Sequence, residues 1–351
     1  MENLRLAVIF GGQSSEYSVS LHSTASFLRA IHKDKYEMTM IGIDQGGNFY
    51  LYEGSIDDLE HDHWKNEKDC TPCAWIHGGI ITVENNPRTF QFDCAFPVLH
   101  GKNGEDGCIQ GLLELMNIHY VGCDVMSSSI SMDKEIMHIL CDEANIPCAD
   151  YLCLRENDEN PSFEEIQKSI PLPWIIKPCN AGSSYGVHFV ENEEEFNEAV
   201  KDAFFYDGRG KILVEKVIKG FEIGCAVMGN GTIKTGSCDE IEITGGFFDF
   251  EGKYEMKNAA IYCPARIEQA TFDEAQDLAK RVYKAMNCTG LARVDMFVQE
   301  DKSVVLNELN TIPGLTATSR YPSMMKAVGL EFPDLIDQLI ELAMERKVGV
   351  C

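Results

Sequence analysis

Short apolar runs that end in glycine alternate with helical patterns along the first part of the chain. The run Leu4–Phe10 leads into Gly11-Gly12, and apolar side chains recur at helical spacing from about Ser20. A strand, a tight glycine turn and a helix open an α/β unit. Further strands are predicted at Met38–Ile43 and Asp93–Leu99, and a helix at Cys108–Met116; Tyr120–Val121 then ends in Gly122, which closes the first unit. Residues 1–125 are therefore expected to form a small open α/β domain.

The rest of the chain mixes short strands with amphipathic helices, a pattern typical of α+β domains. Strands are predicted at Trp174–Lys177, Leu213–Val217, Phe221–Val227, Thr232–Thr235, Met296–Phe297 and Val304–Leu306. Helices are predicted at Lys134–Ala144, Glu193–Phe204, Phe272–Met286 and Phe332–Met344. We expect a central subdomain over residues 126–217 and a C-terminal subdomain over residues 218–351.

The charge balance narrows the class of partner. The 351 residues include 56 acidic and 30 basic side chains, a formal net charge of -26. Such an excess argues against binding to nucleic acid or to an anionic membrane surface. No apolar stretch is long enough to span a bilayer, and the N-terminal run is expected to be a strand rather than a signal peptide. We therefore expect a cytoplasmic protein.

Fourteen cysteines are scattered along the chain. In a chain without an export signal they are expected to be free thiols. Cys70 and Cys73 form one C-x-x-C pair. A second pair or a thioredoxin-like context would be needed for a metal or redox role, so we interpret this pair as part of a surface loop.

A glycine- and serine-rich segment, Gly182–Gly186, follows Lys177 after five residues. Small residues allow backbone N–H groups to approach an anion, as in loops that cradle phosphates. The segment is not a Walker A loop, since no Gly-Lys-Ser/Thr follows. From these residues alone, a phosphate loop and a plain turn are equally good interpretations.

Acidic side chains interrupt two apolar strands near the end of the chain. Asp295 is followed by Glu308, and Asn310 lies two residues further, so positions 308 and 310 share one strand face. Carboxylate and amide oxygens suit Mg²⁺ that holds phosphates. The alternative is a solvated acidic face, which the apolar neighbours make less favourable. Arg293 could offset charge on a transferring phosphoryl group.

A third segment joins a proline-glycine turn to polar side chains. The backbone N–H of Gly314 could serve as an oxyanion donor. Ser319 and Arg320 could bind a carboxylate. A plain turn would explain the proline and the glycine but not the polar cluster beside them.

With these segments aligned, the chain resembles the D-alanine–D-alanine ligase family over nearly its whole length. The matching stretches are Gly11–Glu16 with Val19–Leu21, His100–Gly107, Lys177-Pro178 with Gly182–Ser184, Phe248-Asp249 through Tyr254, Arg293–Asp295, and Asn307–Thr316. The resemblance implies an ATP-grasp fold behind an N-terminal α/β (pre-ATP-grasp) domain. It also implies an ATP-dependent ligase of D-amino acids that takes part in peptidoglycan synthesis.

The resemblance also implies roles for individual residues. ATP contacts would come from Lys134, Lys177, Ser183, Ser184, Glu215, Lys216, Ile218, Glu222, Phe247 and Asn307. Two Mg²⁺ ions, or Mn²⁺ in their place, would be held by Asp295, Glu308 and Asn310. Glu16, Ser183 and Tyr254 would form a hydrogen-bonded triad, with Lys253 on the same mobile loop and with Glu16 and His100 at the first D-amino acid.

The implied reaction has two steps. The carboxylate of the first D-alanine attacks the γ-phosphate of ATP and gives an acyl phosphate, with Lys177 and Arg293 offsetting the charge. The amine of the second D-amino acid then attacks the acyl carbon, and Gly314 and Arg293 stabilise the oxyanion. A loop over residues 245–257 would close and exclude water.

The second substrate is indicated by departures from the housekeeping pattern. Arg320 and the stretch Asp239–Glu242 resemble the VanG type of vancomycin-resistance ligase, which makes D-alanyl-D-serine, and so do Tyr17 and the pair Phe247-Phe248. A polar partner can select a hydroxyl that an apolar pocket cannot. Asp239 and Arg320 are candidates for that partner, with Phe248 as the wall. Tyr254 argues against a D-lactate ligase.

Three alternatives remain at this stage. If Arg320 only pairs with a carboxylate, the second substrate is D-alanine. A different ATP-grasp ligase would lack the combination of Glu16 and Tyr254. A non-catalytic nucleotide-binding module would not need the full set of metal and phosphate residues. The family resemblance further implies a homodimer.

Overall fold

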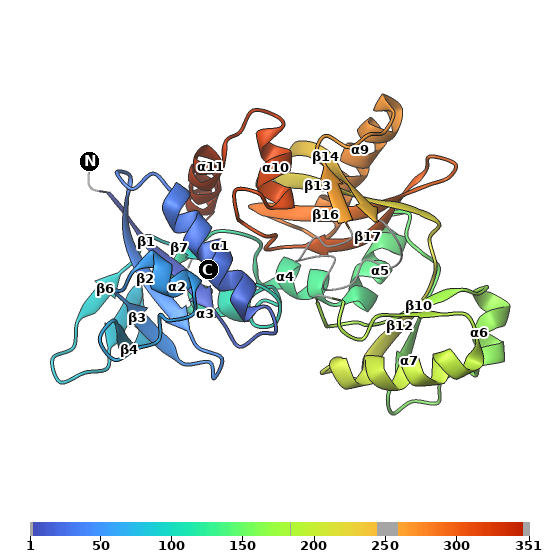
Figure 1. Cartoon of the computed structure of the whole chain (residues 1–351), viewed down its shortest axis with the longest axis horizontal. Helices are drawn as coiled ribbons and strands as arrows, with labels where there is room; N and C mark the ends of the chain where they lie inside the picture. The colour runs from blue at the N-terminus through green and yellow to red at the C-terminus, as the bar shows by residue number, and fades with distance from the viewer. Residues whose placement is uncertain (1–2, 183, 244–258, 347–351) are drawn as a thin grey trace.

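The computed structural model describes residues 3–182, 184–243 and 259–346, which form three β-sheets joined by helices (Figure 1). The first sheet, at the left of Figure 1, has eight strands in the order β6-β5-β4-β3-β2-β1-β7-β8. Strand β1 pairs in parallel with β2 and β7, and β7 with β8, whereas β2 to β6 are antiparallel. The strands are β1 Leu4–Gly11, β2 Tyr36–Ile43, β3 Phe49–Tyr52, β4 Cys70–Ile76, β5 Gly79–Thr82, β6 Thr89–Gln91, β7 Cys94–Pro97 and β8 His119–Tyr120.

Gly11 ends β1 at a close backbone approach. Its φ is +86°, and a Cβ there would lie 2.2 Å from the carbonyl oxygen of Ile43. Only glycine fits such a turn without strain. The chain then enters α1 (Tyr17–Ala30), and the same domain contains α2 (Ile56–Glu60) and α3 (Cys108–Leu115).

The second sheet is small and antiparallel, in the order β11-β10-β12-β9. Its strands are β9 Tyr151–Arg155, β10 Trp174–Pro178, β11 His188–Val190 and β12 Lys211–Lys216. Helices α6 (Phe163–Ser169) and α7 (Glu193–Tyr206) belong to this part of the chain. Trp174 is fully buried beneath them against Phe163 and Phe196, which gives this sheet its own core.

The third sheet is antiparallel, in the order β15-β14-β13-β16-β17. Its strands are β13 Gly220–Met228, β14 Lys234–Ile243, β15 Ala259–Tyr262, β16 Leu291–Gln299 and β17 Val304–Asn310. Helices α9 (Gln269–Ala285) and α10 (Arg320–Lys326) pack against it. The two antiparallel sheets lie beside each other, with the first sheet at the far end of the molecule (Figure 1).

Two helical segments pack against parts of the fold that are distant in the sequence. Helices α4 (Val125–Met132) and α5 (Lys134–Glu143) lie between the sheets in Figure 1, and both contact the third sheet or its helix α9. The last helix, α11 (Phe332–Glu345), returns to pack beside β7 and β8 of the first sheet. Because these helices pack against distant parts of the fold, the domain boundaries at residues 125 and 217 remain a prediction.

The structure corrects some local predictions. The C-x-x-C pair lies in strand β4 rather than in a surface loop, because Cys70 pairs with Tyr52 and Cys73 with Thr82 across the sheet. The strand expected at Thr232–Thr235 instead runs over Lys234–Ile243. The thirteen cysteines of the described residues are all free thiols, as predicted. Among the same residues, no helix has the length and apolar character to cross a bilayer.

Candidate active site

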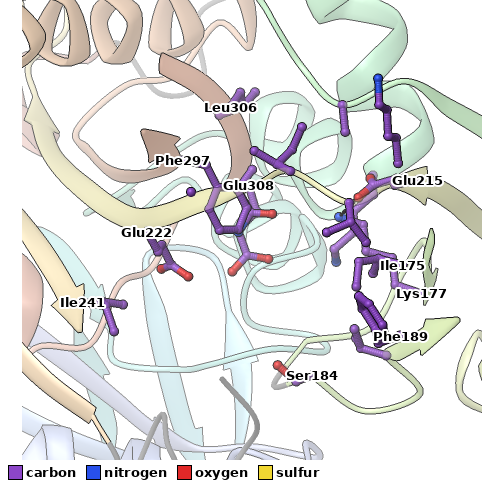
Figure 2. A pocket seen from close by; sticks show the side chains of 18 of the residues that line it. Ile175, Lys177, Ser184, Phe189, Glu215, Glu222, Ile241, Phe297, Leu306 and Glu308 are labelled. Carbon is purple, nitrogen blue, oxygen red and sulfur yellow. Dashed lines mark ion pairs between the residues drawn. The ribbon is translucent and has the colours of Figure 1, made fainter. Parts of the chain in front are cut away.

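A cavity of about 650 Å³ lies between the second and third sheets. We call it the large cavity. Figure 2 shows Ile175 and Phe189 of the second sheet on one side, and Phe297 and Leu306 of the third sheet on the other. Apolar walls on two sides with polar groups at the ends suit a flat ring that carries a charged tail.

Nine of the residues predicted to bind nucleotide or metal line the large cavity. They are Lys134, Lys177, Ser184, Glu215, Lys216, Ile218, Glu222, Asn307 and Glu308. They come from α5, from four strands of the two sheets (β10, β12, β13 and β17) and from the connecting segments, so the fold brings together residues far apart in sequence. Figure 2 shows the Glu222 and Glu308 carboxylates on the third-sheet side, facing Lys177 across the cavity.

Lys177 is held by a buried carboxylate. Its Nζ lies 2.7 Å from Glu215 Oε2, and His138 Nε2 lies 2.7 Å from Glu215 Oε1. Burial raises the pKa of Glu215, but Lys177 and His138 more than reverse this effect and bring it to about 2. Burial lowers the pKa of His138, but hydrogen bonding with Cys148 and Glu215 raises it to about 9. The cluster of Lys177, His138 and Glu215 thus carries two cations around one anion, and its net positive charge suits a phosphate.

Sequence reasoning did not single out His138. It lies on α5, and its partner Glu215 lies on β12, so no spacing along the chain connects them. The apolar character of the helix around a lone histidine was the available signal, and a core histidine would have given the same pattern.

The acidic residues of the third sheet meet as expected from their strands. Asp295 pairs with Glu308 and Arg293 pairs with Asn310 across β16 and β17. Asp295 is buried, and it accepts hydrogen bonds from Arg293 Nη2 at 2.7 Å and from Asn310 Nδ2 at 2.8 Å. Two carboxylates and an amide within one strand pair form a hard oxygen donor set, which fits Mg²⁺.

A second cavity of about 100 Å³ adjoins the first. We call it the small cavity. Lys134, Gly182 and Glu308 line both cavities, and Glu16, Arg293 and Asn310 line only the small one. The Glu16 carboxylate lies between two loops, since a Cβ on Gly101 would be 2.4 Å from its Oε2 and a Cβ on Gly182 would be 3.3 Å away.

Glu105 is a further residue of the small cavity to which the sequence assigned no role. Its Oε2 accepts a hydrogen bond from Gly101 N at 2.8 Å, and its Oε1 accepts one from Ile312 N at 3.0 Å. Burial, with the nearby Glu16 carboxylate, raises the pKa of Glu105 to about 8. It therefore joins two loops of the cavity as a largely neutral acid at pH 7.

His100 lies behind the small cavity rather than in it. Its Nδ1 is 3.1 Å from the carbonyl oxygen of Ile312, and its Nε2 is 3.3 Å from Ser23 Oγ. Burial lowers the pKa of His100, which favours the neutral ring. In this structure it lines a separate cavity of about 240 Å³ with Gly12 and Leu99.

Arg320 stands at the centre of an anionic group. Its Nε and Nη2 each donate to Asp239 at 2.8 Å, its Nη1 donates to Glu222 at 2.9 Å, and Nη1 lies 3.4 Å from Asp295. Asp239 has no exposed surface and also accepts from Gly224 N. Asp239 thus holds the arginine, and it has no surface here for direct contact with a substrate hydroxyl.

Ser319 and Gly314 lie together in the loop before α10. Ser319 Oγ accepts a hydrogen bond from Thr316 N at 3.1 Å, and a Cβ on Gly314 would lie 3.1 Å from the same oxygen. Within the part of the chain that the structure describes, the Gly314 N–H makes no hydrogen bond. That donor is therefore open to a ligand. Five predicted residues, Ser183, Phe247, Phe248, Lys253 and Tyr254, lie outside the described residues.

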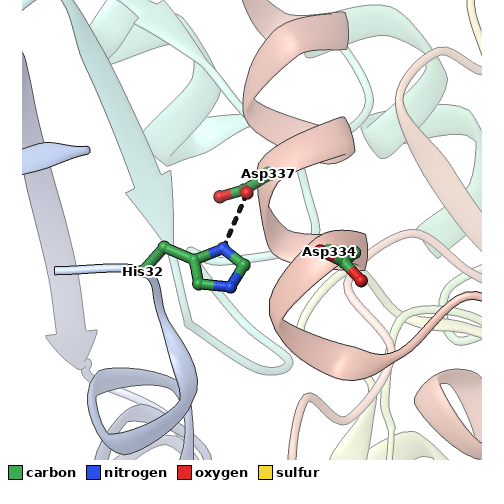
Figure 3. A group of neighbouring side chains, drawn as sticks. All are labelled: His32, Asp334 and Asp337. Atoms are coloured by element: carbon green, nitrogen blue, oxygen red, sulfur yellow. Dashed lines mark hydrogen bonds and ion pairs between the residues drawn. The ribbon is translucent and has the colours of Figure 1, made fainter. Parts of the chain in front are cut away.

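One polar group away from both cavities has metal-ligating side chains: His32, Asp334 and Asp337 (Figure 3). Asp337 already accepts from Lys35 Nζ at 2.5 Å and from the Tyr36 hydroxyl at 2.7 Å, and His32 Nδ1 lies 2.8 Å from it. These contacts join α11 to the residues around β2. We interpret the group as an ion-paired joint between two parts of the fold.

Comparison with known proteins finds matches over nearly the whole chain. The family model for the N-terminal part of D-Ala–D-Ala ligases matches residues 5–123, and that for the C-terminal part matches residues 140–341. The vancomycin C-type resistance protein VanC1 of Enterococcus gallinarum is 43% identical over 345 residues, with 98% of this chain and 99% of that protein covered. A D-alanine–D-alanine ligase of Oceanobacillus iheyensis is 41% identical, with 97% and 95% covered.

The solved structures agree in fold. The VanG D-Ala:D-Ser ligase of Enterococcus faecalis superposes with a TM-score of 0.90 at 41% identity, covering 97% of this chain and 100% of that one. The family matches and this superposition show that the chain belongs to the D-alanine–D-alanine ligase family of ATP-grasp enzymes, which form a carbon–nitrogen bond and consume ATP.

Proposed function

We propose that this enzyme joins D-alanine to D-serine through a D-alanyl phosphate. The observation that carries the proposal is the wall shared by the two cavities, where Lys134, Gly182 and Glu308 line both. A nucleotide in the large cavity and an amino acid in the small one would meet at this wall. Reactants held side by side in this way need little further ordering to react.

In the first step, Glu16 would hold the ammonium of D-alanine, and a carboxylate oxygen would attack the γ-phosphorus while ADP leaves. Lys177, Lys134 and Arg293 would offset the charge that develops on the transferred group. Asp295, Glu308 and Asn310 would hold Mg²⁺, which when bound offsets the negative charge of the phosphates. We propose two such ions, with Mn²⁺ as a possible replacement.

In the second step, the amine of the second amino acid would attack the acyl carbon and release phosphate. The open N–H of Gly314 supports its role as an oxyanion donor. Ser183, Tyr254 and Lys253 are proposed to close the site with the loop that contains them, as the family resemblance implies.

Arg320 supports D-serine as the second substrate. Asp239, Glu222 and Asp295 fix its guanidinium in one orientation, and Gly224 leaves room for it, since a Cβ there would lie 2.5 Å from Nη2. A fixed donor selects a hydroxyl better than an apolar wall. The similarity to the VanG D-Ala:D-Ser ligase agrees with this choice. D-alanine is the second candidate, because a D-alanine–D-alanine ligase is equally similar in sequence.

Competition between the two amino acids tests the proposal. With ATP, Mg²⁺, D-alanine and equal D-serine, mass spectrometry should find mainly D-alanyl-D-serine. Arg320→Leu should lower the ratio of D-serine to D-alanine product about tenfold, because the polar partner is lost. Arg88→Leu, which removes a guanidinium from the distant first sheet, is the matched control and should leave the ratio unchanged. An unchanged ratio in Arg320→Leu would remove the assigned role.

The proposal extends to location and assembly. An enzyme that uses ATP and carries free thiols is expected to act in the cytoplasm. We also propose a homodimer, which light scattering would detect as twice the chain mass of 39.3 kDa. A mass of one chain across a wide concentration range would exclude it.

A further inference from the structure

We propose that the C-terminal end of α7, through Tyr206 and Asp207, positions the described residues of one loop, 180–182 and 184–186, against the nucleotide phosphates. The proposal rests on the proposed function, since it assumes that ATP occupies the large cavity. Among the described residues, Ala181, Gly182 and Ser184 of this loop line that cavity, but neither Tyr206 nor Asp207 does. Both would be positioning residues that act through the loop.

Asp207 fixes the start of the loop. It is buried, with 4% of its surface exposed, and its Oδ1 accepts hydrogen bonds from Asn180 N at 2.8 Å and Asn180 Nδ2 at 3.3 Å. Its Oδ2 accepts from Arg209 N at 3.0 Å and Lys211 N at 2.9 Å. One carboxylate therefore ties the first residue of the loop to the turn that leads into β12.

Tyr206 supports the other end of the loop. Its ring centroid lies 5.6 Å from that of Tyr185. A Cβ added to Gly186 would lie 3.0 Å from Tyr206 Cδ2, and φ of Gly186 is +68°, so the loop backbone lies directly on this ring. The two ends of the loop thus rest on consecutive residues of one helix end.

The loop needs such support because its described residues make few backbone hydrogen bonds with one another. Within it, Tyr185 N donates to Gly182 O and Val187 N donates to Ser184 O, both at 3.3 Å, and Lys134 Nζ donates to Ala181 O at 2.8 Å. Ser184 has a φ of +59°, which L residues rarely adopt without outside support. Preorganised N–H groups stabilise a transferring phosphoryl group only when they are held in place.

Asp207→Asn tests the first contact. An amide has one acceptor oxygen, so its NH₂ must face either Asn180 or the Arg209 and Lys211 N–H groups, and one end of the tie is lost. We expect the Kd for ATP, measured by calorimetry, to rise about tenfold. Hydrogen exchange of the amides of residues 181–187 should become faster. Tyr206→Ala should give the same two changes, and Tyr206→Phe, which keeps the ring, should restore wild-type values.

Asp337→Asn is the matched control. Asp337 is also buried and accepts three side-chain donors, but it lies on α11 away from both cavities. We expect both Asp207→Asn and Asp337→Asn to lower Tm, but Asp337→Asn should leave the ATP Kd and the hydrogen exchange of residues 181–187 unchanged. If Asp207→Asn and Tyr206→Ala also leave both unchanged, the proposal is wrong. Neither readout uses turnover, so a wild-type enzyme that binds ATP but ignores D-amino acids would refute the proposed function alone.

Discussion

Glu215 and Glu105 lie at opposite ends of the site. Burial shifts their pKa values in the same direction, whereas their charged neighbours shift them in opposite directions. Burial raises the pKa of both Glu215 and Glu105. Lys177 and His138 then bring Glu215 down to about 2, whereas Glu105 faces Glu16 and stays at about 8. The neighbours, not the depth, decide whether a buried carboxyl is charged.

The difference follows the chemistry expected at each end. The large cavity gathers Lys134, Lys177 and His138, which suit the anionic phosphates of a nucleotide. The small cavity gathers Glu16 and Glu105, and the Glu16 carboxylate suits the ammonium of an amino acid. Glu308 lies on the wall between them, where a metal ion can balance phosphate and carboxylate. Substitutions at the shared wall and on either side of it test this contrast.

The largest effect is expected at the shared wall. Glu308→Gln should lower kcat roughly a thousandfold, because losing several kcal/mol of metal-dependent charge stabilisation corresponds to about that factor. Phosphate release with D-alanine and D-serine measures it. Tm should stay within a few degrees of the wild type. Turnover near the wild-type rate would refute the metal assignment.

On the cationic side, Lys177→Met should lower kcat/KM for ATP about a hundredfold by removing a phosphate contact. It should also cost about 3 kcal/mol of unfolding free energy, because Glu215 keeps its burial but loses one partner. The double variant Lys177→Met/Glu215→Gln should recover much of the stability but none of the ATP use. Recovery of both together would mean that Lys177 is only structural.

On the anionic side, Glu105 should make the enzyme less stable as pH rises. The pKa is raised from an ordinary 4.5 to about 8, so between these values the unfolded chain releases a proton that the folded one keeps. At pH 5, Glu105→Gln should be about 1–3 kcal/mol less stable than the wild type, because its NH₂ would face a backbone N–H. Its unfolding free energy should nevertheless fall less between pH 5 and 8. An equal slope in both proteins would contradict the assignment.

The smallest effect is expected at His138. Its pKa is raised from 6.5 to about 9, so the stabilisation from its pair with Glu215 is complete below pH 6.5 and is lost as pH rises through 9. His138→Gln should cost about 1 kcal/mol at pH 6 and raise KM for ATP about threefold, because Lys177 still faces Glu215. Denaturant unfolding at pH 6 and 9.5 should show the difference between the two proteins shrinking at the higher pH.

The sequence predicted what repeats locally along a strand or helix. The strand and glycine turn at Leu4–Gly11, and the alternation that puts Glu308 and Asn310 on one face of β17, are both present. The antiparallel strands β3 to β6 were missed, because β3, β5 and β6 have only three or four residues and β4 is mostly exposed or half-buried.

Contacts between distant segments could not be predicted in this way. Glu215 follows His138 by 77 residues, and Arg320 follows Asp239 by 81. Asp239 looked like a ligand in the sequence, but in the fold it is the buried partner of an arginine. Glu105 was part of a matching motif, yet only the structure brings it beside Glu16 and Ile312.

Transfer of oxygen from substrate to phosphate tests the central claim most directly. D-alanine carrying ¹⁸O in its carboxylate would be incubated with the enzyme, ATP, Mg²⁺ and unlabelled D-serine, and the released phosphate would be analysed by mass spectrometry. If D-alanine is activated as an acyl phosphate, each dipeptide formed leaves one ¹⁸O atom in phosphate. Phosphate free of label, released together with dipeptide, would contradict the account.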